Sequence, residues 1–146
     1  MIPTSLSDNI PYLIGDIEHR VYQQLTGIFR ENQVKATLEQ FTALSILWYD
    51  DGLKQQEIAE RLNRDKTTIT RMINNMVRKN MVVKVPDKSD HRAFLIYLTH
   101  LGRQLQEQLM LLSGPVYLKM MKGLKKDEIS SGIALLNKIL GNLKKK

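Results

Sequence analysis

Hydrophobic side chains recur along most of this chain at the three- and four-residue spacing of α-helices. The first stripe predicts a long amphipathic helix from about residue 9 to 31, with Pro11 tolerated in its first turn. A second helix opens at the capping-box pattern Thr37-Leu-Glu-Gln40 and ends at Asp50-Asp51-Gly52. The two apolar stripes comprise Ile10, Leu13, Ile14, Ile17, Val21, Leu25, Ile28 and Phe29, and then Phe41, Leu44, Leu47 and Trp48.

The middle of the chain predicts two short helices joined by a tight turn, followed by a hairpin. The helices are Gln55 to Leu62 and, after the N-cap residue Asp65, Lys66 to Lys79. Strands from Met81 to Val85 and from Phe94 to Thr99 then flank a polar loop over residues 86–92. This order is that of a winged helix-turn-helix, whose second helix enters a DNA major groove.

Two features around the hairpin depend on backbone conformation. Asn80 stands directly after the helix from Lys66 to Lys79, where a residue in the left-handed conformation is expected. Asparagine tolerates that conformation. A short strand around Leu53 could pair with the hairpin, but periodicity alone leaves this open.

Beyond the hairpin, the sequence predicts two further helices. The first carries Leu101, Leu105, Leu109, Leu112 and Val116, and Gly114-Pro115 is expected to kink or break it. The second carries a two-heptad seam of Ile129, Ile133, Leu136, Leu140 and Leu143. The predicted fold is therefore mainly α with a small β-hairpin wing: a winged helix-turn-helix with additional N- and C-terminal helices.

The helix from Lys66 to Lys79 has two chemically distinct faces and no acidic residue. Its apolar arc is Ile69, Met72, Ile73, Met76 and Val77; its polar arc is Lys66, Thr67, Thr70, Arg71, Asn74 and Arg78. Hydroxyls, amides and long cations are the groups that reach base edges and phosphates. Arg71 and Asn74, one turn apart, are expected to face bases, and Arg78 and Lys79 to hold phosphates. An ordinary basic surface helix is the alternative interpretation.

The net charge of +7 is concentrated in the segment from Arg61 to Arg92. Nine basic and three acidic side chains lie between Arg61 and Arg92, which is the electrostatic pattern of a polyanion-binding surface. The absence of cysteine excludes a disulfide scaffold and thiolate metal sites. With no long apolar run and no signal-peptide pattern, the sequence predicts a cytoplasmic protein without membrane partners.

The chain offers little that resembles catalytic or cofactor chemistry. His19, His91 and His100 lack metal-ligand spacing, and no phosphate-binding glycine loop or nucleophile elbow is present. No enzyme activity, metal or cofactor is therefore predicted.

Several motifs resemble the MarR (multiple antibiotic resistance regulator) family of transcription factors. They are the wing sequence Asp90-His91-Arg92-Ala93, the following Leu98-Thr99-His100-Leu101-Gly102, and the helix sequences of residues 57–62 and 67–71. Asn80 replaces the family's usual glycine, and Lys126 stands where a capping serine or threonine is common. The resemblance implies that Arg92 reaches the minor groove while Asp90 braces the wing; the wing DNA contacts would be Lys88, Asp90 and Arg92.

The terminal helices contain more apolar surface than the winged region can cover, which predicts a homodimer built on Ile14, Ile17, Ile133, Leu136 and Leu140. The resemblance implies the same dimer; a monomeric helical bundle is the alternative. It also implies a repressor on an inverted-repeat operator and a small aromatic or anionic effector. Tyr22 and Trp48 could line an effector crevice, although each also has a plain core explanation.

These predictions assign residues 1–146 to a single domain. Residues 37–99 form its DNA-binding region, and residues 1–36 and 100–146 its helical dimerisation region. The predicted function is sequence-specific binding of double-stranded DNA in transcription regulation. The alternative is a basic winged-helix module that binds protein or structured RNA, because a fold alone does not fix a function.

Overall fold

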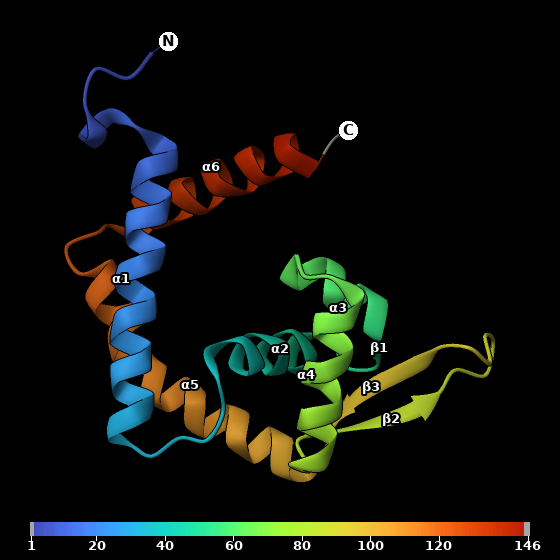
Figure 1. The fold of residues 1–146 in the computed structure, drawn as a ribbon. Helices are drawn as coiled ribbons and strands as arrows, with labels where there is room; N and C mark the ends of the chain where they lie inside the picture. The colour runs from blue at the N-terminus through green and yellow to red at the C-terminus, as the bar shows by residue number, and fades with distance from the viewer. Residues whose placement is uncertain (1, 145–146) are drawn as a thin grey trace. The chain divides into compact units, whose positions relative to one another are not determined.

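The computed structural model describes residues 2–144, which form helices and one small sheet (Figure 1). Their order is η1 (Leu6–Asp8), α1 (Ile10–Glu31), α2 (Leu38–Tyr49), β1 (Leu53–Lys54), α3 (Gln55–Leu62), α4 (Lys66–Arg78), β2 (Val82–Pro86), β3 (Phe94–Leu98), α5 (His100–Met121) and α6 (Lys126–Lys144). The predicted fold class is confirmed: the protein is mainly helical with a small antiparallel sheet.

Local side-chain chemistry fixes the helix ends where the sequence predicted them. The Asn9 side chain accepts the Tyr12 N–H and opens α1. Thr37 and Gln40 form the reciprocal capping box of α2. The Asp65 carboxylate accepts the Thr68 N–H at 2.8 Å and opens α4. Each cap satisfies a backbone donor that has no partner within its helix.

The sheet joins the hairpin to the segment before α3. Strand order is β1-β3-β2, all antiparallel, with Leu53 opposite Ile96 and Val83 opposite Tyr97. The strand around Leu53 therefore does pair with the hairpin. The hairpin extends past α4 and carries its loop at the far end (Figure 1).

The strand ends differ from prediction by one residue, and the reason is visible in the hydrogen bonds. The Met81 carbonyl accepts the Thr99 N–H instead of continuing the ladder, and the Thr99 hydroxyl accepts the Gly102 N–H. Thr99 thus serves the start of α5 rather than the end of β3. Asn80 has φ +58°, which confirms its left-handed conformation.

The chain divides into two compact units, Met1–Ser113 and Gly114–Lys146, and the hydrophobic core lies in the first. Its completely buried members come from α2, α3, α4, β3 and α5: Ala43, Leu44, Leu47, Ile58, Ile69, Ile73, Met76, Ile96 and Leu109. Burying such side chains is the main favourable contribution to folding. The core holds α3 and α4 against α2 and the sheet.

Two predictions about packing are corrected. Val77 was placed on the buried arc of α4 but is 37% exposed, because it lies in the last turn at the edge of that arc. Leu101, placed on the apolar stripe of α5, is 47% exposed in that helix's first turn. Of the kink or break predicted for α5 at Gly114-Pro115, the break is absent, because the helix continues from His100 to Met121. A proline removes only one helical donor. A kink at this position stays a prediction.

Candidate nucleic-acid interface

Polar contacts join the helix-turn-helix to α2 and to the residue that caps its C-terminus. Asn63, with φ +53°, ends α3 in the left-handed conformation and leaves room for a two-residue turn before α4. In that turn Arg64 contacts Glu39 at 2.7 Å, and on α3 Arg61 contacts Asp50 at 2.6 Å. The charges of these two arginines, counted in the basic stretch, are therefore paired with carboxylates of the same chain.

Helix α4 presents the predicted polar face. Lys66, Thr67, Arg71, Asn74 and Arg78 are exposed, and Ile69, Ile73 and Met76 are buried beneath them. A shallow hollow of about 420 Å³ on this face is lined by Lys66, Thr67, Thr70, Arg71 and Asn74. Five of the six residues predicted for this helix, all except Thr70, are thus exposed on one face.

Thr70 differs from its neighbours because its hydroxyl is engaged inside the protein. The Thr70 hydroxyl donates to the Lys66 carbonyl at 2.8 Å and accepts from the Gln55 side chain at 2.7 Å. Its exposure is intermediate. Thr70 therefore connects α4 to the start of α3, a role that helical periodicity could not reveal.

The wing loop is ordered by two aspartates rather than one. Asp90 accepts the Arg92 N–H at 3.1 Å, which gives it the bracing contact that the family resemblance implied. Asp87 accepts the backbone and hydroxyl of Ser89 at 3.0 and 2.9 Å, and lies 3.7 Å from the Lys54 ammonium. The backbone N–H of Ser89, then its hydroxyl and the charge of Lys54, lower the pKa of Asp87.

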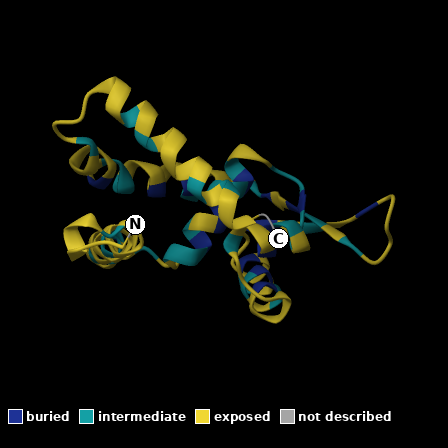
Figure 2. Ribbon diagram, turned by 90° about the horizontal axis from the view of Figure 1, so that it is seen from above, coloured by how far each residue is buried: buried dark blue, intermediate teal, exposed yellow. Residues whose placement is uncertain are grey.

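Asp87 is the bracing residue that sequence reasoning missed. It is 8% exposed, whereas the rest of the loop, from Lys88 to Arg92, is exposed (Figure 2). A buried carboxylate at the base of a polar loop has no distinct sequence pattern. The signal was its place directly after β2, where a side chain can turn back toward Lys54 on β1.

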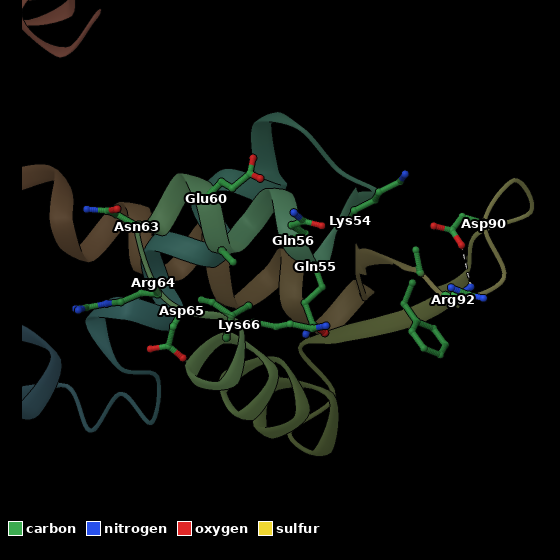
Figure 3. A pocket seen from close by; sticks show the side chains of 14 residues that line it. Lys54, Gln55, Gln56, Glu60, Asn63, Arg64, Asp65, Lys66, Asp90 and Arg92 are labelled. Carbon is green, nitrogen blue, oxygen red and sulfur yellow. Dashed lines mark hydrogen bonds between the residues drawn. The ribbon is translucent and has the colours of Figure 1, made fainter. Parts of the chain in front are cut away.

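A groove of about 860 Å³ separates the wing from α3 and the start of α4 (Figure 3). Gln55 and Lys66 line its helical side, and Asp90 and Arg92 its wing side. Within residues 2–144, none of Lys66, Arg71, Arg78, Lys88 and Arg92 has a carboxylate within salt-bridge distance. Their charges are available to an anionic partner.

The predicted effector crevice is not formed by the hollows described above. Tyr22 on α1 is 57% exposed, and Trp48 on α2 is partly buried against the core; neither lines either hollow. Trp48 therefore packs as the core explanation expects and Tyr22 does not, and an effector crevice at either residue stays a prediction. The dimerisation candidates Ile14 and Ile17 on α1, and Ile133, Leu136 and Leu140 on α6, are all exposed by 40% or more.

Other chemistry finds little support in the described part of the chain. Among residues 2–144, no three His, Asp or Glu side chains converge as metal ligands. None of the helices of that range is long and apolar enough to cross a membrane.

Helix-turn-helix, three-stranded sheet and charged wing loop together define a winged helix-turn-helix protein. Residues 36–94 match the sequence profile of the MarR family. The multiple antibiotic resistance protein MarR of Escherichia coli is 28% identical over 130 residues, which cover 87% of this chain and 90% of that protein. Over its winged helix-turn-helix region this chain is therefore similar to the MarR family, whose proteins are transcriptional regulators.

Other relatives match to differing extents. The regulator TtmR of Methylorubrum extorquens is 27% identical over 71% of this chain but only 52% of its own length, so the chain spans about half of that relative. The structure of Staphylococcus aureus MepR bound to DNA is 28% identical with a TM-score of 0.78, and covers 93% of this chain and 98% of that one. A MarR-family structure from Silicibacter pomeroyi has a TM-score of 0.87 at 24% identity over 97% and 94% of the two chains, which shows the shared fold.

Proposed function

We propose that this protein binds double-stranded DNA sequence-specifically, as a homodimer on an inverted repeat, and represses transcription from it. The observation that carries the proposal is the set of exposed Lys and Arg side chains on α4 and the wing loop, namely Lys66, Arg71, Arg78, Lys88 and Arg92, which have no acidic partner among residues 2–144. Such side chains neutralise phosphates and contact base edges.

The distribution of groups on α4 favours base readout over simple adhesion to a polyanion. Arg71 and Asn74 lie in the middle of the exposed face and line the same hollow. Arg78 lies in the last turn, where a helix docked in a groove approaches the backbone. A protein partner would favour exposed aromatic or aliphatic side chains on this face, which carries polar groups instead.

Dimerisation is supported by the apolar surface that the described chain leaves exposed. In α6, which is described over its full length, no residue is buried, and Leu136 and Leu140 are 53% and 48% exposed. Apolar surface of this extent on a helix is typical of an interface. Two copies of α4 about one helical turn of DNA apart would match an inverted repeat.

A small aromatic or anionic effector that releases the DNA is also part of the proposal. The structure of CouR from Rhodococcus jostii was determined with p-coumaroyl-CoA, and at 17% identity with a TM-score of 0.80 it shares the fold of this chain. For this protein, the candidate residues remain Tyr22 and Trp48. Loss of DNA binding on addition of aromatic carboxylates would identify the effector class.

The decisive experiment separates base readout from phosphate contact on α4. Duplexes selected by the wild-type protein from a random pool serve as operator, and scrambled duplexes serve as reference. Asn74→Ala should reduce the preference for the operator, because a bidentate base contact contributes about 1–3 kcal/mol of discrimination. Arg78→Ala should weaken both duplexes alike and reduce the salt dependence by about one unit of slope.

The same measurements test the alternative of an interaction module. Selective binding of structured RNA over every duplex would overturn the proposal, as would wild-type protein that selects no sequence. Asn74→Ala could instead lower the affinity for both duplexes equally while Arg78→Ala removes the preference for the operator. That result would contradict the proposed placement of α4 in the groove.

A further inference from the structure

The side chain of Lys84 on β2 forms a polar contact between the wing and α4. Its Nζ donates to the Asn74 Oδ1 at 2.6 Å and lies 5.7 Å from the centroid of the Phe94 ring. Lys84 pairs with Ile96 across the hairpin, so it lies on the face that also carries the buried Val82 and Ile96. This placement directs a charged side chain from the sheet toward α4.

The contact restricts the orientation of the Asn74 amide. A carboxamide can rotate by half a turn and thereby exchange its acceptor oxygen for its donor nitrogen. A lysine ammonium can only donate hydrogen bonds. It therefore bonds the amide oxygen, and it cannot bond the amide NH₂ group, which is itself a donor. With Lys84 in place, the Asn74 oxygen faces β2 and its NH₂ group faces away from Lys84.

The environment of Lys84 keeps it available for this contact. Among residues 2–144 its ammonium forms no ion pair with a carboxylate. The nearby Phe94 ring offers a cation–π contact that limits the positions of the side chain. Its exposure is intermediate, whereas its neighbours Val83 and Val85 are each 41% exposed on the other face of the hairpin. The ammonium is thus held between wing and helix.

We propose that Lys84 is a positioning residue that fixes which hydrogen-bonding edge Asn74 presents to DNA, and so determines which base pair Asn74 selects. This inference rests on the proposed function. In the major groove an A·T pair and a T·A pair present the same donor and acceptor groups in opposite order. An amide of fixed polarity distinguishes them, whereas an amide that rotates freely adapts to both.

The test measures discrimination between a base pair and its inversion. Random-pool selection with wild-type protein and with Asn74→Ala first locates the base pair that depends on Asn74. Affinities are then measured for the selected duplex and for a duplex with that one pair inverted. Lys84→Met retains the aliphatic stem but removes the donor, and should lower this affinity ratio by about fivefold or more, the smaller end of what a bidentate contact provides.

Three further variants make the result specific. In the Asn74→Ala background, Lys84→Met should leave the ratio unchanged, because Lys84 acts through Asn74. Lys84→Arg, which restores a donor, should recover the wild-type ratio. Lys88→Met, an equal change of charge on the exposed wing loop, should weaken both duplexes alike without altering the ratio.

Three results would overturn the inference: an unchanged ratio in Lys84→Met, a further loss of ratio in the Asn74→Ala background, or a uniform loss of affinity like that of Lys88→Met. The second would make Lys84 a direct base contact and the third a phosphate contact. If the wild-type protein selects no duplex sequence from the random pool, that result contradicts both the proposed function and this inference. Circular dichroism of each variant confirms that the fold is retained, and the Lys84→Arg comparison provides the answer if Lys84→Met does not fold.

Discussion

Gly102 is the residue whose replacement the structure tolerates least among the glycines of the described chain. A Cβ atom added there would lie 2.0 Å from the Met81 carbonyl oxygen. That oxygen also accepts the Thr99 N–H, and the Thr99 hydroxyl donates to the adjacent Asn80 carbonyl at 2.6 Å, so the Met81 carbonyl cannot move without disturbing the junction between the wing and α5. This close approach explains the spacing of Thr99 and Gly102 in the family motif.

Gly102→Ala should therefore destabilise the protein by about 1–3 kcal/mol or more, the usual cost of forcing extra volume into a packed site. Urea denaturation followed by circular dichroism would measure it. Gly27→Ala is the matched control, since its added Cβ would meet only the Arg30 side chain at 4.0 Å. That change should be neutral or slightly stabilising, because alanine favours helix over glycine. Similar midpoints for the two variants would contradict the packing argument.

At the wing, Arg92 and Asp90 should affect DNA binding by different routes. Arg92→Ala removes an exposed cation that would enter the minor groove, where the negative potential is strong. Asp90→Ala removes the acceptor of the Arg92 N–H and should loosen the loop that positions the Arg92 side chain. Both should lower affinity for the selected duplex, with the fold intact. Unchanged binding by both variants at about 150 mM salt would show that the wing does not contact DNA.

At the scale of elements, α4 depends on its N-cap as well as on its buried face. The Asp65 carboxylate accepts both the N–H and the hydroxyl of Thr68, and these bonds, the backbone one first, lower the pKa of Asp65. A carboxylate at a helix N-terminus is also favoured by the helix dipole. The cap therefore stabilises the start of the helix proposed to read DNA.

Because the folded pKa of Asp65 lies below its ordinary value of 3.8, this contribution is present above about pH 4 and is lost as the pH falls through the folded pKa. Asp65→Ala should lower the urea midpoint at pH 7, and the difference from wild type should shrink below pH 4. Asp65→Asn retains a neutral cap and should not show that convergence. A constant difference between wild type and Asp65→Ala down to pH 3 would contradict the role of the charged cap.

At the scale of the whole molecule, the exposed apolar side chains of α1 and α6 define the proposed interface. Leu136→Lys with Leu140→Lys should reduce the sedimenting mass toward that of one chain, because two charges would have to be buried at the interface. Lys138→Glu, an exposed change on the same helix, should leave the mass unchanged. A wild-type protein that sediments as a monomer at micromolar concentration would contradict dimerisation.

Caps, amphipathic stripes and the left-handed Asn80 could be predicted from the sequence because each depends on interactions within a few residues. For that reason local patterns predicted the bounds of α3, the cap of α4 and the capping box of α2. Helical periodicity likewise predicted which residues form the polar face of α4. The family motif at Asp90 and Arg92 added the wing contacts. These features together determined the fold class and the predicted DNA-binding surface.

Contacts between segments distant in the sequence were decided only by the tertiary structure. Lys84 and Asn74 are ten residues apart on different elements, and the pairing of their side chains depends on how the hairpin lies against α4. The Gln55–Thr70 bond and the buried place of Asp87 beside Lys54 depend on the same packing. Periodicity assigns a residue to a face, but which polar group meets it there is determined by the packing of other elements.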